Sequence, residues 1–179
     1  MKKVWPLIDY GLRIIMIKQK NGFTMVDTVV VISIMFIFST LAITRITSYN
    51  TVKLFSVANK LAMDIRYTQQ LGISKQKQCG LSFDPGNDSY FVYIDTTTDK
   101  ATDPFSRGAL IVNYQTDPYY KGVDLVSTSF GNKLIFDQVG KPLDSSAVSL
   151  ASDGQIVLQT QGESMTITIT RDTGRVSIQ

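Results

Sequence analysis

The longest apolar segment of the chain covers residues 23–43, and it carries no charge from Val29 onward. As a helix, these 21 residues would span about 31 Å, which matches the hydrocarbon core of a membrane. Asp27 is the only charged residue within the segment. The pattern therefore predicts a transmembrane or assembly helix over residues 23–44.

The helical pattern continues beyond this segment, but it becomes amphipathic. Apolar side chains recur at spacings of four, three and four residues, at Leu54, Ala58, Leu61 and Ile65. Polar side chains lie between them, at Lys53, Asn59, Lys60 and Asp64. An apolar stripe with a polar opposite face is typical of a helix that lies against a protein core. We therefore predict that segment 45–78 continues the same helix, which ends at about Gly72 or a little beyond.

Residues 79–179 change to a period of two, which predicts strands. The expected strands are 80–83, 90–94, 110–114, 134–136, 148–150, 156–158, 165–170 and 175–178. Residues 84–88 carry a strong turn signal, and residues 172–174 are expected to turn the last two strands into a hairpin. Residues 95–107 are expected to form a polar loop. The predicted fold class is α+β, with a long N-terminal helix packed on a mainly antiparallel β head.

The charge of the chain is unevenly distributed. The formal net charge is +3, but residues 1–22 hold five of the 18 basic residues and one of the 15 acidic residues. The remaining 157 residues have 13 basic and 14 acidic side chains, a net charge of −1. A nearly neutral head gives no general reason to expect binding to nucleic acid or to an anionic membrane.

The residue types exclude several chemistries. There is no histidine, which removes the commonest general base and metal ligand. The lone Cys79 has no partner for an internal disulfide, and we expect it to be a small buried residue. No nucleophile–base pair or Gly-rich phosphate loop is present, so no enzyme activity and no cofactor are expected.

Three acidic residues recur every four positions in the expected loop: Asp95, Asp99 and Asp103. They lack the Asp-any-Asp spacing and the central glycine of a calcium-binding loop, and calcium needs six to eight converging oxygen ligands. We therefore expect turn-forming residues in a solvated loop, and no metal site.

The polar flank of the apolar segment, Asn-Gly-Phe-Thr-Met-Val-Asp at residues 21–27, contains the most informative residue of the chain. An ionised carboxylate at a bilayer centre costs about 2.5–3.5 kcal/mol, and somewhat less near an interface. A helix that served only as an anchor would be more stable without Asp27. We therefore interpret Asp27 as a group that is retained for a partner.

This flank resembles the N-terminus of type IV pilins and type II secretion pseudopilins. The resemblance implies that a prepilin peptidase cuts between Gly22 and Phe23, on the cytoplasmic side, and N-methylates Phe23. Residues 1–22 would then be a cleaved leader. The fifth mature residue of the family is usually Glu, and here it is Asp27. At Thr44 many relatives have a helix-kinking proline, so its absence favours a straight helix.

The charges of this site suggest how it would act. Cleavage creates an ammonium group on Phe23, four residues before Asp27. In or near lipid, opposite charges attract strongly because screening is weak. Pairing between neighbouring helices would neutralise both charges and would set the stagger of the helices. The alternative is a plain signal-anchor helix, in which Asp27 lies in the first turn because the helix dipole favours a negative charge there.

The basic residues of the leader predict the orientation in the membrane. Lys2, Lys3, Arg13, Lys18 and Lys20 outnumber a single acidic residue. This bias favours a cytoplasmic N-terminus and a head exported from the cytoplasm. We expect a single-pass inner-membrane protein that later enters a filament. A leader of 22 residues is long for a pseudopilin, and a translation start at Met16 would give seven residues.

The downstream sequence is similar to the minor pseudopilin H (GspH/FimT) family. The similar segments are residues 61–67, 75–78, 136–142, 152–156 and 173–176. The resemblance implies a low-abundance subunit near the tip of a pilus or pseudopilus. Its implied partners are the prepilin peptidase/methyltransferase, other pilins or pseudopilins and the inner-membrane assembly platform.

One branch of this family takes up DNA through a C-terminal Gly-Arg-any-Arg motif. Gly174 and Arg175 fit this motif, but Ser177 replaces the second arginine. The candidate DNA contacts are Arg171, Arg175, Lys133 and Lys141. Lysine and arginine contacts to phosphate dominate such affinity, so nucleic-acid binding is the alternative and not the expected function.

Overall fold

The computed structural model describes residues 24–179, except for the side chains of residues 40–48. The chain divides into two units at Ala42–Ile43, and each is described by itself. Helix α1, Met25–Lys75, has 51 residues and passes through both units. Residues 1–23 lie outside the described residues, and with them the predicted leader 1–22, the proposed start at Met16 and the Gly22–Phe23 cleavage site. Thr44 lies within α1, but its side chain is not described.

In the first unit, the described part of α1 exposes apolar side chains all round. Val26, Val29, Ile32 and Phe36 are each at least 60% accessible to solvent. The described residues contain no helix that is both long enough and apolar enough to cross a membrane. The predicted span 23–44 lies partly outside those residues.

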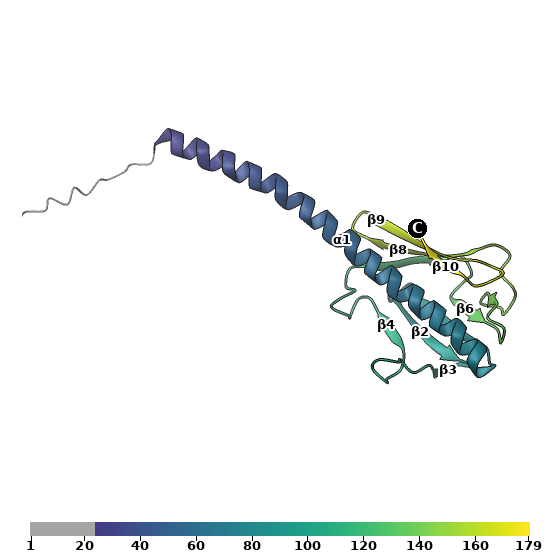
Figure 1. Ribbon diagram of the computed structural model, residues 1–179. Coiled ribbons are helices and arrows are strands. Elements are labelled where there is room, and N and C mark those ends of the chain that lie inside the picture. The colour runs from purple at the N-terminus through teal and green to yellow at the C-terminus, as the bar shows by residue number, and fades with distance from the viewer. Residues whose placement is uncertain (1–23) are drawn as a thin grey trace, which may run out of the picture. The chain divides into compact units, whose positions relative to one another are not determined.

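In the second unit, the C-terminal half of α1 packs on a head of antiparallel strands (Figure 1). The predicted apolar stripe is confirmed, because Leu54, Ala58, Leu61 and Ile65 are at most 1% exposed. Burying a side chain such as Leu61 contributes about 1.5–3 kcal/mol. Asp64 is an exception to the predicted polar face, because it is buried beside the stripe.

The head contains two antiparallel sheets. The six-stranded sheet has the order β3-β2-β1-β6-β7, and β4 also pairs with β2. Its strands are β1 (Cys79–Asp84), β2 (Ser89–Ile94), β3 (Thr96–Lys100), β4 (Ile111–Asn113), β6 (Lys133–Phe136) and β7 (Pro142–Leu143). The four-stranded sheet has the order β10-β9-β8-β5. Its strands are β5 (Asp124–Thr128), β8 (Gly154–Thr160), β9 (Glu163–Ile169) and β10 (Val176–Ile178).

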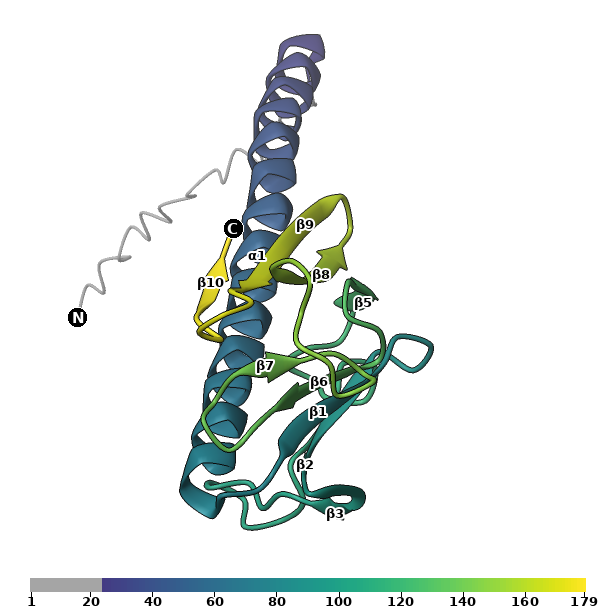
Figure 2. The same ribbon diagram turned by 90° about the vertical axis from the view of Figure 1, so that its right-hand side faces the viewer.

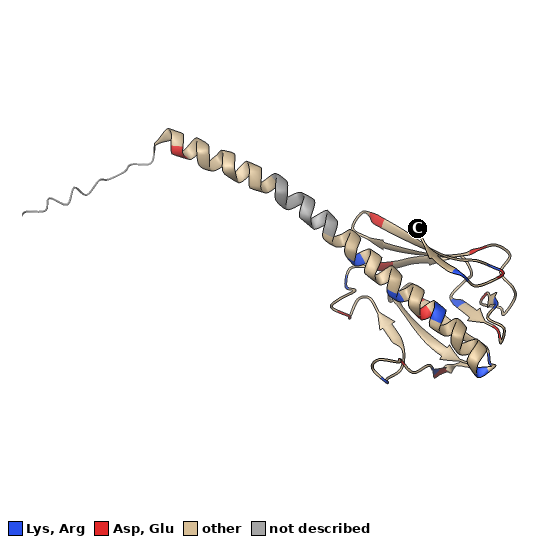
Figure 3. Ribbon diagram, viewed as in Figure 1, with Lys and Arg blue, Asp and Glu red and all other residues tan. Residues whose placement is uncertain are grey.

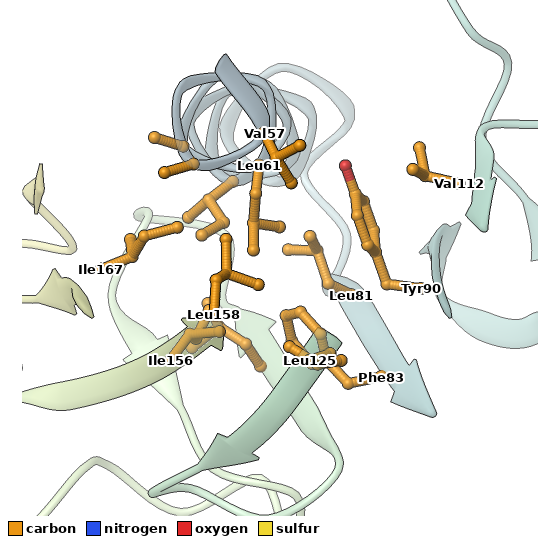
Figure 4. Packing of buried hydrophobic residues seen from close by; sticks show 14 of the residues in the cluster. Val57, Leu61, Leu81, Phe83, Tyr90, Val112, Leu125, Ile156, Leu158 and Ile167 are labelled. Atoms are coloured by element: carbon orange, nitrogen blue, oxygen red, sulfur yellow. The ribbon is translucent and has the colours of Figure 1, made fainter. Parts of the chain in front are cut away.

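The core lies between α1 and the two sheets. Figure 4 shows Val57 and Leu61 of α1 pointing toward Leu81 of β1 and Leu158 of β8. Phe83 packs against Tyr90 with ring centroids 6.0 Å apart. Because side chains from both sheets meet the same helix face, the apolar stripe of α1 organises the whole head.

Most of the predicted head is confirmed. The turn at 84–88 joins β1 to β2, and the turn at 172–174 joins β9 to β10 as an antiparallel hairpin. Ile167 and Ile169 face the core, as their alternation predicts, and Met165 packs partly against it.

One loop prediction and one strand prediction are wrong, and strands β5 and β7 were not predicted. The expected loop 95–107 contains β3, a Thr-rich edge strand whose residues are mostly exposed and so show no apolar alternation. The expected strand 148–150 forms only an isolated bridge between Ser149 and Leu143. The backbone of Ala147 has a φ of 59°, a left-handed conformation that interrupts an extended chain, and Val148 is exposed.

Candidate assembly site

The first turn of α1 is closed by a reciprocal cap between Thr24 and Asp27. The Asp27 N–H donates to Thr24 Oγ1 at 3.3 Å, and the Thr24 N–H donates to Asp27 Oδ2 at 3.0 Å. The Thr24 hydroxyl also donates to Oδ2, at 2.9 Å. Because α1 begins at Met25, Thr24 is the N-cap and Asp27 is the third helical residue. This is the capping-box arrangement, with Asp in place of Glu or Gln.

The cap leaves part of the carboxylate available. Within residues 24–179, the hydrogen bonds to this side chain all end on Oδ2, so Oδ1 faces the surroundings without a donor. Asp27 is the one charged residue between Thr24 and Ser39. In Figure 3 the first turn of α1 has a red segment, and the described helix that directly follows it is tan. The geometry places a fixed, exposed carboxylate at the start of an apolar helix. The structure does not test the predicted pairing of Asp27 with the amine of Phe23, because Phe23 lies outside the described residues.

The two described serines farther along this unit bond the helix backbone. Ser33 Oγ donates to the Val29 carbonyl and Ser39 Oγ donates to the Met35 carbonyl, each at 2.8 Å. A serine that bonds the carbonyl four residues back removes its hydroxyl from competition for water. This half of α1 therefore presents an apolar surface that lipid tails or other apolar helices can cover.

In the head, Asp64 joins α1 to the six-stranded sheet. Lys60 Nζ lies 2.6 Å from Oδ1 and 2.7 Å from Oδ2 of Asp64, and the Tyr90 hydroxyl donates to Oδ2 at 2.7 Å. Burial, with the neighbouring Tyr114 and Asp64 adding to it, raises the pKa of Tyr90 well above its ordinary value. The periodicity placed Asp64 on the polar face. Asp64 follows Lys60 by four residues, and this spacing could have indicated the ion pair from the sequence.

A second buried tyrosine lies beside this network. The Tyr90 and Tyr114 rings have centroids 5.9 Å apart in an edge-on arrangement. The Tyr114 hydroxyl is buried near Tyr90 and makes no hydrogen bond of normal geometry in the described part of the chain. Burial also raises the pKa of Tyr114. Asp64, Tyr90 and Tyr114 are buried between the helix and the sheet, whereas Lys60 is partly exposed, so we interpret the network as structural.

The four candidate DNA contacts do not share one cavity. Arg171 Nε lies 3.4 Å from Asp172 Oδ2, and Arg171 Nη1 donates to the Ala151 carbonyl at 3.1 Å. Lys133 lines a cavity with Tyr93 and Asp95. Arg175 lines a different cavity, beside Arg66 of α1. Lys141 follows the turn between β6 and β7, and its N–H donates to Asp137 Oδ1 at 2.7 Å.

The three acidic residues considered for calcium have separate roles. Asp95 Oδ2 lies 3.3 Å from Lys77 Nζ, and Asp99 is exposed on β3. Asp103 accepts hydrogen bonds from the Phe105 N–H and the Ser106 hydroxyl, which lower its pKa. Among the described residues, no three acidic, Cys or His side chains are grouped so that they could hold a metal ion.

The expectation for Cys79 is confirmed. It is a free, buried cysteine at the start of β1. Burial raises the pKa of its thiol, which keeps it protonated at neutral pH.

Comparison with known proteins finds similarity at the level of structure. No protein-family model and no curated protein sequence matches the chain. The minor pseudopilin EpsH from the type 2 secretion system of Vibrio cholerae matches with a TM-score of 0.52 and 11% identity, over 71% of this chain and 96% of that chain. The type IV minor pilin FimU of Pseudomonas aeruginosa, in space group P21, matches with a TM-score of 0.50 and 11% identity, over 72% and 90% of the two chains.

The chain has the pilin fold. The predicted α+β architecture is confirmed, because a helix packs on antiparallel sheets as in these two structures. The predicted likeness to a minor pseudopilin is confirmed for the fold. In this pilin fold, the Asp64 network fastens α1 to the head, whereas Asp27 lies in the other unit.

Proposed function

We propose that this protein is a minor pilin or pseudopilin, a structural subunit of a type IV pilus or of a type II secretion pseudopilus. The observation that carries the proposal is the capped, exposed carboxylate of Asp27 at the start of an apolar helix that continues into a pilin-fold head. EpsH and FimU are a minor pseudopilin and a minor pilin, so both support a structural role and not a catalytic one.

The proposed mechanism begins with proteolysis. A prepilin peptidase removes residues 1–22 and methylates the new amine of Phe23. The ammonium group of one subunit then pairs with Asp27 of its neighbour. The Thr24 hydrogen bonds hold the carboxylate in one orientation and leave Oδ1 for the incoming amine. Since both groups lie in apolar surroundings, their attraction is weakly screened.

The same half of α1 has two successive environments in this proposal. Before assembly, residues 23–44 lie in the inner membrane with the head outside the cytoplasm. During assembly, the platform moves the subunit into the filament, near its tip, and neighbouring helices replace the lipid around side chains such as Val29 and Phe36. The intrahelical bonds of Ser33 and Ser39 suit both environments.

Substitution of Asp27 tests the pairing. We expect Asp27→Val to be processed and inserted but to enter filaments at a level at least tenfold below that of the unchanged protein, measured by quantitative immunoblotting of sheared filaments. Asp27→Glu, which keeps a carboxylate, should assemble. Normal incorporation of Asp27→Val would refute the pairing.

A second variant separates pairing from capping. Thr24→Val removes the hydroxyl that bonds Asp27, but it keeps both the carboxylate and the Thr24 backbone N–H. Loss of an N-cap costs about 0.5–2 kcal/mol of helix stability, so this variant should assemble at a reduced level. If Thr24→Val were as defective as Asp27→Val, the carboxylate would act only as a helix cap.

A further inference from the structure

A cavity between α1 and the β9–β10 hairpin contains two arginines without an acidic partner. Its lining residues are Arg66, Gln69, Gln70, Gly174, Arg175 and Val176. The ion pairs of the described residues are Lys60–Asp64, Lys77–Asp95 and Arg171–Asp172. Neither Arg66 nor Arg175 is among them, although both line the same cavity and both are exposed to solvent.

The hairpin holds Arg175 in a defined position. The Gly174 N–H donates to the Thr170 carbonyl at 2.8 Å, and the Thr170 N–H donates to the Arg175 carbonyl at 2.9 Å. Gly174 has a φ of 68°, a left-handed conformation that glycine adopts at little cost. The result is a tight turn that ends at Arg175.

Gln69 fastens this turn to the helix. Its Nε2 donates to the Thr173 carbonyl at 2.9 Å and to the Gly140 carbonyl at 2.8 Å. A Cβ at position 174 would lie only 2.6 Å from that nitrogen, so the approach of Gln69 requires glycine there. The cavity is therefore built on fixed elements.

The second arginine comes from the helix. Arg66 Nη2 donates to the Val176 carbonyl at 3.1 Å, which orients its guanidinium along β10. Figure 2 shows β10 beside this part of α1. The contact uses one donor of Arg66, and a guanidinium has five. Arg66, Gln70 and Arg175 therefore line the cavity with hydrogen-bond donors and positive charge.

We propose that this cavity binds a carboxylate of an acidic peptide segment, namely an Asp or Glu side chain of a neighbouring subunit. A guanidinium presents a planar pair of donors that matches the two oxygens of a carboxylate. Both positive charges line one cavity of about 460 Å³, which has room for a carboxylate side chain. The identity of the donor as a neighbouring subunit rests on the proposed filament function. The binding of a carboxylate in this cavity does not depend on the proposed filament function.

The distribution of charge favours an acidic peptide over DNA. DNA affinity depends on several cations that contact successive phosphates. Of the other three residues expected for a DNA surface, Arg171 is paired with Asp172, Lys133 lines another cavity, and Lys141 does not line the arginine cavity. The head therefore has a local anion site and not a continuous basic track through these residues.

Titration of the full processed protein in nonionic detergent tests the proposal. The probe is the peptide acetyl-Ala-Asp-Glu-Ala-amide, and the control is acetyl-Ala-Asn-Gln-Ala-amide. Nitrogen-15 NMR follows the Nε–Hε signals of Arg66 and Arg175, which are assigned by substitution. We expect the acidic peptide to shift both signals saturably and the amide peptide to leave them unchanged.

Variants then assign the binding. Arg66→Gln and Arg175→Gln should each weaken binding at least fivefold, and Arg175→Lys should weaken it at least threefold because it keeps the charge but not the planar donors. Arg107→Gln removes an equal charge from a loop outside the cavity and should have no effect. Circular dichroism shows which variants are folded. If one arginine variant does not fold, the other still tests the site.

Three results would overturn the inference. The amide peptide could shift the two signals as much as the acidic peptide does, or both glutamine variants could bind the acidic peptide as well as the unchanged protein. The third result is that a 12-base-pair DNA duplex saturates the two signals and the acidic peptide has no effect. Normal filament incorporation of a protein that binds no acidic peptide would reject this site alone. Absence of the unchanged protein from filaments would reject the filament proposal and would leave the peptide titration valid.

Discussion

The Tyr90 hydroxyl donates to Asp64 Oδ2 at 2.7 Å, and this bond joins strand β2 to helix α1 inside the core of the head. Lys60 supplies the opposite charge from the next turn of the same helix. A buried carboxylate is tolerated only when donors satisfy it, so the three side chains form one unit. The stability of the head should depend on this unit more than on any exposed ion pair.

Removal of the Tyr90 hydroxyl should destabilise the protein. Tyr90→Phe leaves Asp64 buried with one donor fewer, and a hydrogen bond to a charged group contributes about 1.5–3 kcal/mol. We expect a loss of that size in the free energy of unfolding, measured by urea denaturation. Tyr119→Phe, at an exposed position, should change it by less than about 0.5 kcal/mol. Equal stability of Tyr90→Phe and the unchanged protein would show that the bond makes no net contribution.

The same chemical change at Tyr114 should have the opposite sign. Its hydroxyl is buried and makes no hydrogen bond of normal geometry among the described residues, and an unsatisfied polar group costs about 1–3 kcal/mol. Tyr114→Phe should therefore raise the free energy of unfolding, by about 1 kcal/mol. Destabilisation by this variant would mean that the hydroxyl is satisfied in solution.

Stability should fall at alkaline pH. Burial raises the pKa values of Cys79, Tyr90 and Tyr114 in the folded state. These groups therefore lose protons more readily when the protein unfolds, so their contribution is complete below their ordinary pKa values and is lost above them. We expect the free energy of unfolding to decline from about pH 9 upward, because that is near the ordinary pKa of a thiol.

Tyr114→Phe provides the control for this pH dependence. With one titrating group removed, the decline above about pH 10 should be shallower by about 1.4 kcal/mol per pH unit. Denaturation curves at half-unit steps from pH 7 to pH 11 would measure both slopes. Identical slopes would show that Tyr114 ionises equally in the folded and unfolded protein.

Gly174 should be the most sensitive position of the β9–β10 turn. In Gly174→Ala the new Cβ would meet Gln69 Nε2 at 2.6 Å and the Phe136 ring at 3.0 Å, in addition to the strain of a positive φ. We expect a loss of about 2–4 kcal/mol, since a left-handed non-glycine residue alone costs about 1–3 kcal/mol. Gly162→Ala is the matched control, because Gly162 has a φ of 89° and open space around it. Thermal unfolding should separate the two variants, and equal losses would mean that the contact with Gln69 is unimportant.

The proposed processing after Gly22 would have a direct chemical signature. Intact-mass analysis of the membrane-extracted protein should give a chain that begins at methylated Phe23. A bulky replacement, Gly22→Leu, should leave an uncut precursor, because the proposed cut falls directly after Gly22. A native protein that retains residues 1–22 would refute the processing step. A peptide covering Trp5 to Arg13 in the precursor would exclude a start at Met16.

Local pattern was sufficient for the long helix and for the hairpins. The spacing of Leu54, Ala58, Leu61 and Ile65 is a property of neighbouring turns, so it identifies the buried face before any partner is known. The turns at 84–88 and 172–174 are set by residues that favour tight turns, and they join the strands that the alternation predicts. Asp27 also stood out from the sequence, because a charge in an apolar segment is costly wherever the segment lies.

Tertiary structure alone decided the remaining features. Asp64 is buried because the hydroxyl of Tyr90, which is 26 residues away in the chain, donates a hydrogen bond to its carboxylate beside the apolar stripe of α1. Arg66 and Arg175 line one cavity because β10 folds back along α1, and no local pattern connects residues so far apart in the chain. Strand β3 forms because β2 offers it backbone hydrogen bonds, although its own exposed threonines carry no apolar signal. The sequence determines which surfaces must be covered, and long-range packing determines which polar groups come together.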